Sequence, residues 1–591
     1  MAIIRGTPQK LKQELYGFQI FFITLSVVIG SGIFVNNGSA FGISGPLGLL
    51  VATLIMSVVV LSVNACVAEF SQRFPIQNAI VEYVRTFVDD DLGWVIGLAY
   101  WYAYAASFAT QNSMAGALLE YWGLPTIWRA LISYALAPLV LLLLNLTGVF
   151  WYGIVETIGG LLKLIMIVSI SIYLYVVAGH EGEVSDAYSL GFYADMGFNN
   201  PGHAACFAIP ITAYAFQGIE LYAMAAFEAR DAHAIRWPSR WITYVVVVVY
   251  IMCTVGEILT VKWNNPELPR LHDGTSESRN STSRTNSMII LAALGREHKS
   301  VAGFLNGCLL FSAFSAANTS LYVASRTLYG MASSIPGNLW IARKLRTLSP
   351  GTQVPIVALL VTAFAFCWVP FLNINDGFVV QVVSTSSSNA IMIVWAAICL
   401  AFLRYYHWIK THDRELEQAG RPEFRRDAKE QLSGGLLHSL QPVQAWIGLI
   451  GCLVIFAFSS ATWWGSSATV TEVAMAYGAH LVLFVSLVIL KVCRGRKRWF
   501  RKTPVADQLL MDLNNLRVRK LNKREQTTWE RFKGVLRRLL SLGASSAQRV
   551  PELPELPDQP VSQYNLISPP NGVVNLQASA PVSHPRESSD T

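Results

Sequence analysis

The chain has 591 residues, of which 53% are apolar and only 14% are charged. Soluble domains average about 25% charged residues, so this composition excludes an ordinary soluble protein and indicates one embedded in a membrane. The formal charge of +8 does not indicate nucleic-acid binding, because the basic residues lie in short loops and in the C-terminal tail. The eight cysteines form no CxxC pair and the histidines show no ligand spacing, so we expect no metal and no cofactor.

Twelve apolar stretches are long enough to cross a bilayer, since a spanning helix needs about 20 residues. They lie near 18–43, 46–71, 94–119, 128–147, 152–178, 201–227, 241–262, 301–330, 354–374, 377–402, 442–463 and 474–492. With twelve spans, most Lys-rich and Arg-rich loops share one side, as cytosolic loops do. We therefore predict a cytosolic N-terminal tail (1–17), a twelve-span domain (18–492) and a cytosolic C-terminal tail (493–591), basic at first and then mostly disordered.

The loop between the seventh and eighth spans, 263–300, then faces outward. It contains Asn280-Ser281-Thr282, an acceptor pattern for N-linked glycosylation. We predict that Asn280 is glycosylated.

Span 1 carries Gly30, Ser31 and Gly32 near its midpoint, where small residues weaken a helix. Within a bilayer, a broken helix occurs only where it lines a cavity, and transporters place such breaks at their substrate sites. Three adjacent small residues would equally suit close packing between intact helices. Both interpretations stay open from this stretch alone.

Span 6 offers a second break, because Gly218 and Glu220 lie in its middle beside Phe216. In a fold of two inverted five-helix repeats, spans 1 and 6 occupy matching positions. Two facing breaks present helix N-termini that attract a carboxylate and freed carbonyls that attract a cation. A molecule with both groups is an amino acid, so the sequence predicts an all-α integral membrane protein with broken helices 1 and 6 and an amino acid site.

Five motifs in chain order resemble a known family. "IGSGIF", "AEFSQRFPIQNAIVEYVRTFVDDDLGWVIGLAYW", "GIVETIGGLLKLIMI", "FQGIELYAMAAFEARD" and "LNGCLLFSAFSAANTSLYVASRTLYGMA" are similar to segments of the yeast amino acid transporter family, within the amino acid–polyamine–organocation superfamily. The resemblance covers residues 15–490. The chain departs from the pattern at Ser31, where Thr is usual, and at Asn36 and Asn37, where Gly and Ser are more usual.

The resemblance implies roles for single residues. Phe216 would be an aromatic lid over the substrate, against a lipid-facing or core Phe. Lys163 in span 5 would occupy the place of sodium in sodium-coupled relatives and leave the coupling to protons, against a structural ion pair. Glu220 would contact the substrate amine or carry a proton, since burial favours the neutral carboxyl; a structural hydrogen bond is the alternative.

We expect a secondary transporter that imports an amino acid with protons across a fungal plasma membrane, with both termini in the cytosol. A non-transporting amino acid sensor on the same fold is the alternative. An enzyme is not expected, because no catalytic constellation appears in the sequence. Membrane lipids should contact the spans and the basic stretch after Lys491, and cytosolic regulators could bind the C-terminal tail.

Overall fold

The computed structural model describes residues 11–180, 191–193, 200–265, 268, 287–335, 339–372, 378–419, 424, 440–459, 470–495 and 499–516. All of them belong to the first of two units into which the chain divides, Met1–Phe532. The predicted glycosylation site Asn280 and the tail beyond residue 516 lie outside the described residues.

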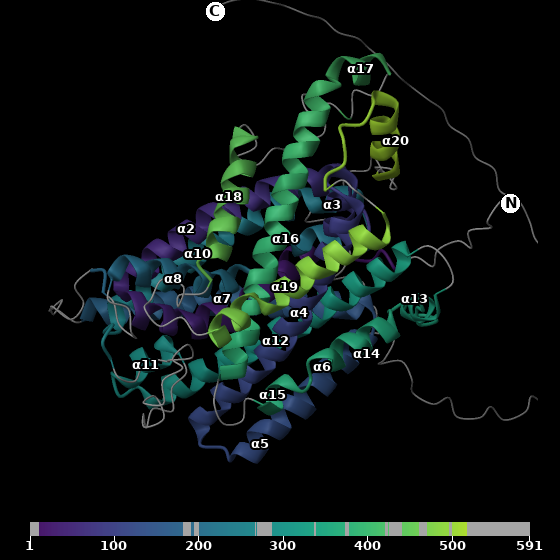
Figure 1. Cartoon of the computed structure of the whole chain (residues 1–591). Coiled ribbons are helices and arrows are strands. Elements are labelled where there is room, and N and C mark those ends of the chain that lie inside the picture. The colour runs from purple at the N-terminus through teal and green to yellow at the C-terminus, as the bar shows by residue number, and fades with distance from the viewer. Residues whose placement is uncertain are drawn as a thin grey trace, which may run out of the picture. The chain divides into compact units, whose positions relative to one another are not determined.

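The described chain is helical, with one isolated β-bridge between Leu15 and Ala229 (Figure 1). In chain order its helices, with 3₁₀ and π turns marked η, are α1 Gly17–Val28, η1 Gly32–Asn36, α2 Asn37–Arg73, α3 Ala79–Phe87, α4 Asp90–Leu118, η2 Leu119–Trp122, α5 Thr126–Ala130, η3 Leu131–Leu136, α6 Ala137–Leu146, α7 Val149–His180, α8 Pro201–Ala213, η5 Tyr214–Phe216, α9 Leu221–Ala225, η6 Ala226–Glu228, η7 Ala232–Ile235, α10 Arg236–Thr260, α11 Met288–Leu294, α12 Lys299–Ser334, α13 Trp340–Leu345, α14 Ile356–Ala365, α15 Val369–Leu372, α16 Phe378–Thr411, α17 Asp413–Gln418, α18 Val443–Ala457, α19 Val470–Cys493 and α20 Ala506–Leu516. The predicted all-α class is confirmed.

Length and composition suit the helices to a membrane. Within the described residues, eight helical segments are long and apolar enough to cross one, and two apolar helices, α14 and α18, are shorter. The first segment runs from Gly17 to Arg73 and contains both predicted spans 1 and 2. The boundary between the two spans lies at Gly45, whose φ of 73° is not helical. Helices occupy the positions of all twelve predicted spans, and the number that cross the bilayer stays a prediction.

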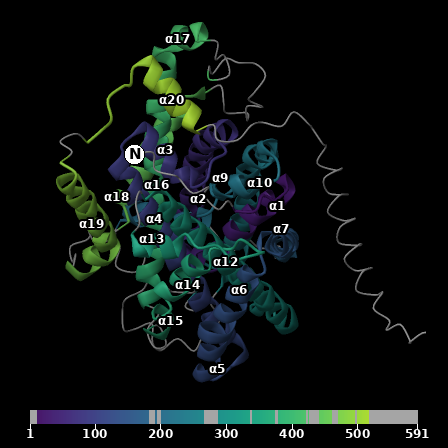
Figure 2. The same cartoon turned by 90° about the vertical axis from the view of Figure 1, so that its right-hand side faces the viewer.

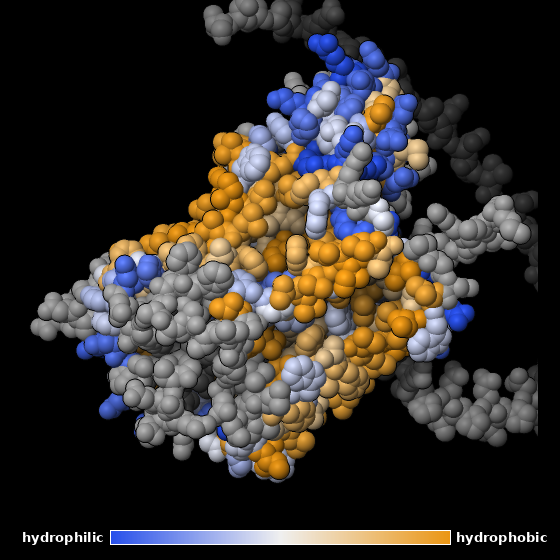
Figure 3. All heavy atoms as spheres, in the orientation of Figure 1, coloured by the Kyte–Doolittle hydropathy of each residue, from blue (hydrophilic) through white to orange (hydrophobic). Residues whose placement is uncertain are grey.

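Apolar side chains cover much of the outside of these helices. Val482 on α19, Ile450 on α18 and Leu143 on α6 are among those most exposed. Figure 3 shows hydrophobic atoms over the long helices and hydrophilic atoms gathered around α17 and α20. A surface this apolar matches lipid rather than water. Figure 2 shows α17 and α20 together at one end of the molecule.

Capping residues set several of the helix starts. Asp89 accepts hydrogen bonds from the backbone N–H groups of Asp91 and Leu92 at the start of α4, which satisfies two of its unpaired donors. Asn200 does the same for Gly202 at the start of α8, and Pro201 follows it at the first helical position, where its missing N–H costs nothing.

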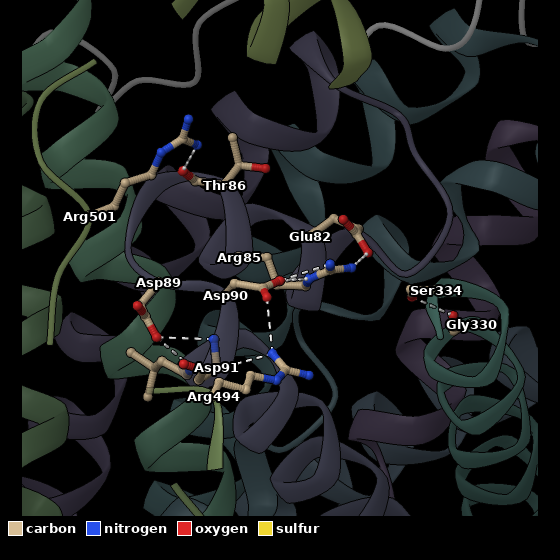
Figure 4. A network of polar contacts seen from close by, with 11 residues as sticks. Glu82, Arg85, Thr86, Asp89, Asp90, Asp91, Gly330, Ser334, Arg494 and Arg501 are labelled. Carbon is tan, nitrogen blue, oxygen red and sulfur yellow. Dashed lines mark hydrogen bonds and ion pairs between the residues drawn. The ribbon is translucent and has the colours of Figure 1, made fainter. Parts of the chain in front are cut away.

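The turn between α3 and α4 also receives the end of α19 and the segment after it. Lys491 Nζ lies 2.6 Å from Asp89 Oδ1, and Arg494 Nη1 lies 2.6 Å from Asp91 Oδ1. Figure 4 shows Arg494 between the two neighbouring aspartates, Asp90 and Asp91. Arg501 donates from its backbone to Val88 O at 2.8 Å. Part of the basic stretch predicted to face lipid headgroups therefore pairs with the protein's own aspartates.

Candidate functional site

The predicted break in span 1 is present. Helix α1 ends at Val28, and Ile29 takes an extended conformation with φ −76° and ψ 90°. The chain becomes helical again at Ser31 and continues as the π-helical turn η1. The carbonyls at the end of α1 and the N–H groups at the start of the next helix are therefore released from the regular helical pattern.

The predicted break in span 6 is also present. Helix α8 passes into η5, the chain leaves helical geometry over Gln217–Glu220, and α9 resumes at Leu221. Gly218 has φ +111°, a backbone conformation that residues with a Cβ rarely adopt. A glycine is therefore required for this turn.

The two breaks lie against each other. A Cβ added to Gly218 would lie 2.4 Å from Val27 Cγ1, one residue before the end of α1. A Cβ added to Gly32 would lie 2.7 Å from Ala215 Cα in η5. Small residues thus permit the close approach that brings both sets of freed backbone groups to one place.

A tyrosine hydroxyl joins the two breaks. Tyr250 on α10 places its Oη 2.6 Å from Val28 O and 2.9 Å from Ala215 O. Ser312 on α12 donates to Ile29 O at 2.9 Å. The freed carbonyls that were predicted to attract a cation are thus paired with neutral hydroxyl groups.

Ser31 presents two donors at the start of the helix after the break. Its Oγ lies 2.6 Å and its backbone N lies 3.2 Å from the same atom, Oε1 of Gln111 on α4. A carboxylate oxygen would accept from the same pair of donors. Gly30 lies beside this contact, since an added Cβ would be 3.0 Å from Gln111 Nε2.

Phe216 closes the end of η5. Its ring packs against Tyr250 with centroids 5.0 Å apart and an interplanar angle of 63°. Because Phe216 is buried, the lipid-facing alternative is wrong. Its position beside both breaks suits a lid, which stays a prediction.

Glu220 is fully buried and has a donor for each oxygen. Tyr104 on α4 donates to Oε1 at 2.6 Å, and Trp395 Nε1 on α16 donates to Oε2 at 3.0 Å. Both donors are neutral, so this carboxyl is held without a salt bridge among the described residues. The hydrogen bonds connect the second break to the helices that surround it.

Lys163 is buried on α7 and donates to Ser26 O at 2.6 Å. This carbonyl belongs to the last turn of α1, where carbonyls lack helical partners and the helix dipole favours a cation. Ser26 Oγ in turn donates to Glu156 at 2.5 Å, and Asn318 donates to the other Glu156 oxygen at 2.5 Å. Lys163 thus bonds a backbone carbonyl close to the buried carboxyl of Glu156, and both the coupling role and the alternative of a structural ion pair stay predictions.

A salt bridge lies at the end of span 6. Arg326 on α12 lies 3.3 Å from Glu228 at the end of span 6, and Tyr322 donates to the same carboxylate at 2.6 Å. Leu15 pairs with the backbone of Glu228 and Arg230 through hydrogen bonds of 3.0 and 2.8 Å. This set joins the segment before α1 to spans 6 and 8. We call it the latch.

Sequence reasoning missed several of these residues: Gln111, Tyr104, Tyr250, Trp395 and Ser312. Tyr250 follows five valines, and a lone hydroxyl in such an apolar run is a signal that could have marked it. Gln111 lies in a polar stretch of span 3 and carried a similar signal. Neither pattern identifies the partner, which lies on another helix.

Two facing helix breaks inside an apolar helical protein are typical of secondary transporters. The amino acid permease model matches residues 19–505, which is most of the chain. The chain therefore belongs to the amino acid permease family: it is a multi-pass membrane transporter of amino acids and not an enzyme.

Curated relatives are fungal permeases. A probable lysine/arginine permease of Candida albicans is 27% identical over 68% of this chain and 70% of its own length. A lysine/arginine permease of the same species is 26% identical over 81% of this chain and 80% of its own. A proline-specific permease of Emericella nidulans is 28% identical over 68% of this chain and 73% of its own.

Solved structures agree on the fold. A manganese transporter of Eremococcus coleocola superimposes with a TM-score of 0.52 at 12% identity, covering 87% of this chain and all of the transporter. This likeness concerns the arrangement of helices alone. In the described part of this chain, no group of three or more His, Cys, Asp or Glu residues could hold a metal ion.

Proposed function

We propose that this chain imports an amino acid together with protons across a fungal plasma membrane. The observation that carries the proposal is the meeting of the two helix breaks, where Gly218 packs on Val27 and Tyr250 bridges Val28 and Ala215. Ser31, Gly30 and Gly32 supply the carboxylate end of the site, and the freed carbonyls supply the amine end.

The substrate is an α-amino acid, and the proposal does not specify its side chain. The relatives' names cover lysine, arginine and proline, and further relatives are a dicarboxylic amino acid permease and an S-methylmethionine permease of Saccharomyces cerevisiae. Cationic, neutral and acidic side chains share only the amino acid head group. The contacts around Ser31 and the two breaks suit that shared part.

Proton coupling is supported by Lys163 and Glu220. Lys163 places its ammonium on a carbonyl at the end of α1, where a fixed cation removes the need for a bound sodium ion. Glu220 is a buried carboxyl at the second break with neutral donors only. Burial favours its protonated form, so it can take up and release a proton as its surroundings change.

The test uses the full chain in two settings. A radiolabelled panel of amino acids in permease-deficient cells identifies the substrate. Uptake into proteoliposomes is then measured under an imposed pH gradient, with and without sodium. We expect uptake to follow the pH gradient, Lys163→Ala to lose driven uptake, and Glu220→Gln to lose accumulation while retaining exchange.

Two results would refute the coupling proposal. Uptake that follows sodium and ignores pH would remove the roles given to both residues. Binding of an amino acid without uptake of any would favour the sensor instead.

The orientation has its own test. We expect a glycan on Asn280 and a cytosolic location for the residues after Lys491. A glycan on Asn145 in place of Asn280, or a C-terminal tag accessible outside intact cells, would contradict the twelve-span arrangement.

A further inference from the structure

Glu257 is a buried carboxyl that the proposed mechanism does not use. It lies one turn before the end of α10 and is fully buried. Its Oε2 accepts a hydrogen bond from Asn37 Nδ2 at 2.8 Å, and the same nitrogen lies 3.3 Å from Thr254 Oγ1. Its Oε1 has no hydrogen-bond partner among the described residues.

Other buried membrane carboxyls of the described chain are better satisfied. Glu220 has Tyr104 and Trp395, and Glu228 has Arg326 and Tyr322. Glu257 has one neutral amide on one oxygen. A buried carboxylate with so little compensation is strongly disfavoured relative to the protonated acid.

Within the described residues, no charged side chain is paired with Glu257 in a salt bridge or hydrogen bond that would change this balance. The helices packed against α10 include α1, α2, α7 and α11. Helices α1 and α11 contain no titratable residue, and α2 contains none before Cys66. The titratable residues of α7 are Tyr152, Glu156, Lys163, Tyr173, Tyr175 and His180.

Two of these residues have other partners. Lys163 donates a hydrogen bond to Ser26 O, and Tyr175 donates one to Met252 O. On α10, Cys253 lies one turn before Glu257, Arg236 and Arg240 lie at the opposite end, and Lys262 beyond the helix is exposed.

Asn37 connects this carboxyl to the broken helix. It is the first residue of α2 and directly follows η1, on the far side of the break from α1. The break separates this half of span 1, residues 32–44, from α1, and the proposal takes the two halves to move separately in the transport cycle. The hydrogen bond to Glu257 joins this half-helix to α10, and a change in the charge of Glu257 changes that bond.

We propose that Glu257 is a second proton-binding site of the transport cycle and that Asn37 couples its protonation to the position of the second half of span 1, residues 32–44. The inference rests on the proposed proton coupling. In the conformation described here Glu257 holds its proton, and it releases the proton when movement of the half-helix admits water.

The experiment measures accumulation by the full chain in proteoliposomes. A radiolabelled mixture of the protein amino acids is supplied under a pH gradient of about one unit, with the membrane potential clamped, and the accumulated component is identified by chromatography. One coupled proton contributes about tenfold to the limiting accumulation for each pH unit. We expect Glu257→Gln to retain exchange and to lose about tenfold in accumulation.

Two further variants sharpen the result. Thr254→Val alters the same cluster without touching the carboxyl, so its accumulation should match the wild type. Asn37→Ser keeps the carboxyl and removes its donor. Because that donor favours the charged carboxylate, the pH of half-maximal exchange should move upward. This second readout holds even if Glu257→Gln does not reach the membrane.

The outcomes separate the two proposals. Wild-type accumulation that ignores the pH gradient removes proton coupling altogether, and this inference with it. A wild type that follows the gradient, together with unchanged accumulation in Glu257→Gln or an unchanged pH profile in Asn37→Ser, overturns the second site alone.

Discussion

Gly218→Ala tests whether the two helix breaks meet as the structure places them. The added methyl group would enter a backbone conformation at φ +111°, which costs a residue with a Cβ about 1–3 kcal/mol. It would also lie 2.4 Å from Val27 Cγ1, far inside the normal carbon contact of about 3.5–4.0 Å. Overpacking of this kind costs about 1–3 kcal/mol.

The two costs can be separated with a second change. Val27→Ala removes two methyl groups and costs about 1.6 kcal/mol by itself. In the double variant the clash with Val27 is gone, while the backbone cost at residue 218 remains. We therefore expect the double variant to be more stable than the sum of the single variants by about 1–3 kcal/mol.

The assay is unfolding of the detergent-purified protein, followed by intrinsic fluorescence in denaturant, with uptake measured in parallel. Gly307→Ala is the matched control, because an alanine Cβ there meets nothing within 4 Å, and it should be stabilising by about 0.5–1 kcal/mol. Strict additivity of Gly218→Ala and Val27→Ala would refute the reasoning. It would mean that the two side chains do not meet and that the breaks do not face each other.

Three further changes probe the site, the latch and the tail. Ser31→Ala removes a donor at the carboxylate end and should weaken substrate binding by about 1.5–3 kcal/mol, whereas Ser31→Thr should bind as the wild type does; equal affinities in titration calorimetry would contradict this. Arg326→Gln removes the salt bridge to Glu228 in the latch. We expect the protein's cysteines to be labelled faster from the cytosolic side and uptake to fall, and an unchanged labelling rate would refute this. Asp91→Asn should lower the free energy of unfolding by about 1–3 kcal/mol. Arg494→Gln should lower it less in the Asp91→Asn background than in the wild type. Additive losses in denaturant unfolding would show that Asp91 and Arg494 do not interact.

The positions of the helix breaks could be predicted because they depend on local chemistry. Gly30, Ser31 and Gly32 weaken span 1, and Gly218 permits a backbone conformation that few other residues allow. Both features are visible within a few residues of sequence. Their alignment in the fold followed from the repeat rule for transporters.

The partners across the site could not be predicted in the same way. Ser31 meets Gln111 across 80 residues of sequence, Glu228 meets Arg326 across 98, and Asn37 meets Glu257 across 220. Each contact depends on the rotation and height of two helices, and apolar spans give weak information about either. The sequence analysis therefore assigned no role to Glu257, whose Oε1 has no hydrogen-bond partner among the described residues.

The pairing of the freed backbone groups explains how such a site can bind and still release its substrate. An unpaired buried polar group costs about 1–3 kcal/mol, so both breaks need partners at every stage of the cycle. In this conformation Gln111 accepts from Ser31, and Tyr250 and Ser312 approach the carbonyls of Val28 and Ile29. These partners are neutral and belong to neighbouring helices, and under the proposed function the head group of an amino acid would replace them.

The exchange of one set of hydrogen bonds for another leaves a modest net gain. A typical protein hydrogen bond contributes only about 0.5–1.5 kcal/mol net, and one to a charged group about 1.5–3 kcal/mol. Under the proposed function, the charged ends of the substrate would gain over the neutral side chains they replace by an amount that favours binding without preventing release. Lys163 differs from these partners, because its ammonium stays on Ser26 O and already supplies the positive charge at the end of α1. The pairing thus distinguishes the contacts that we propose to exchange with the substrate from the contact of Lys163 with the end of α1.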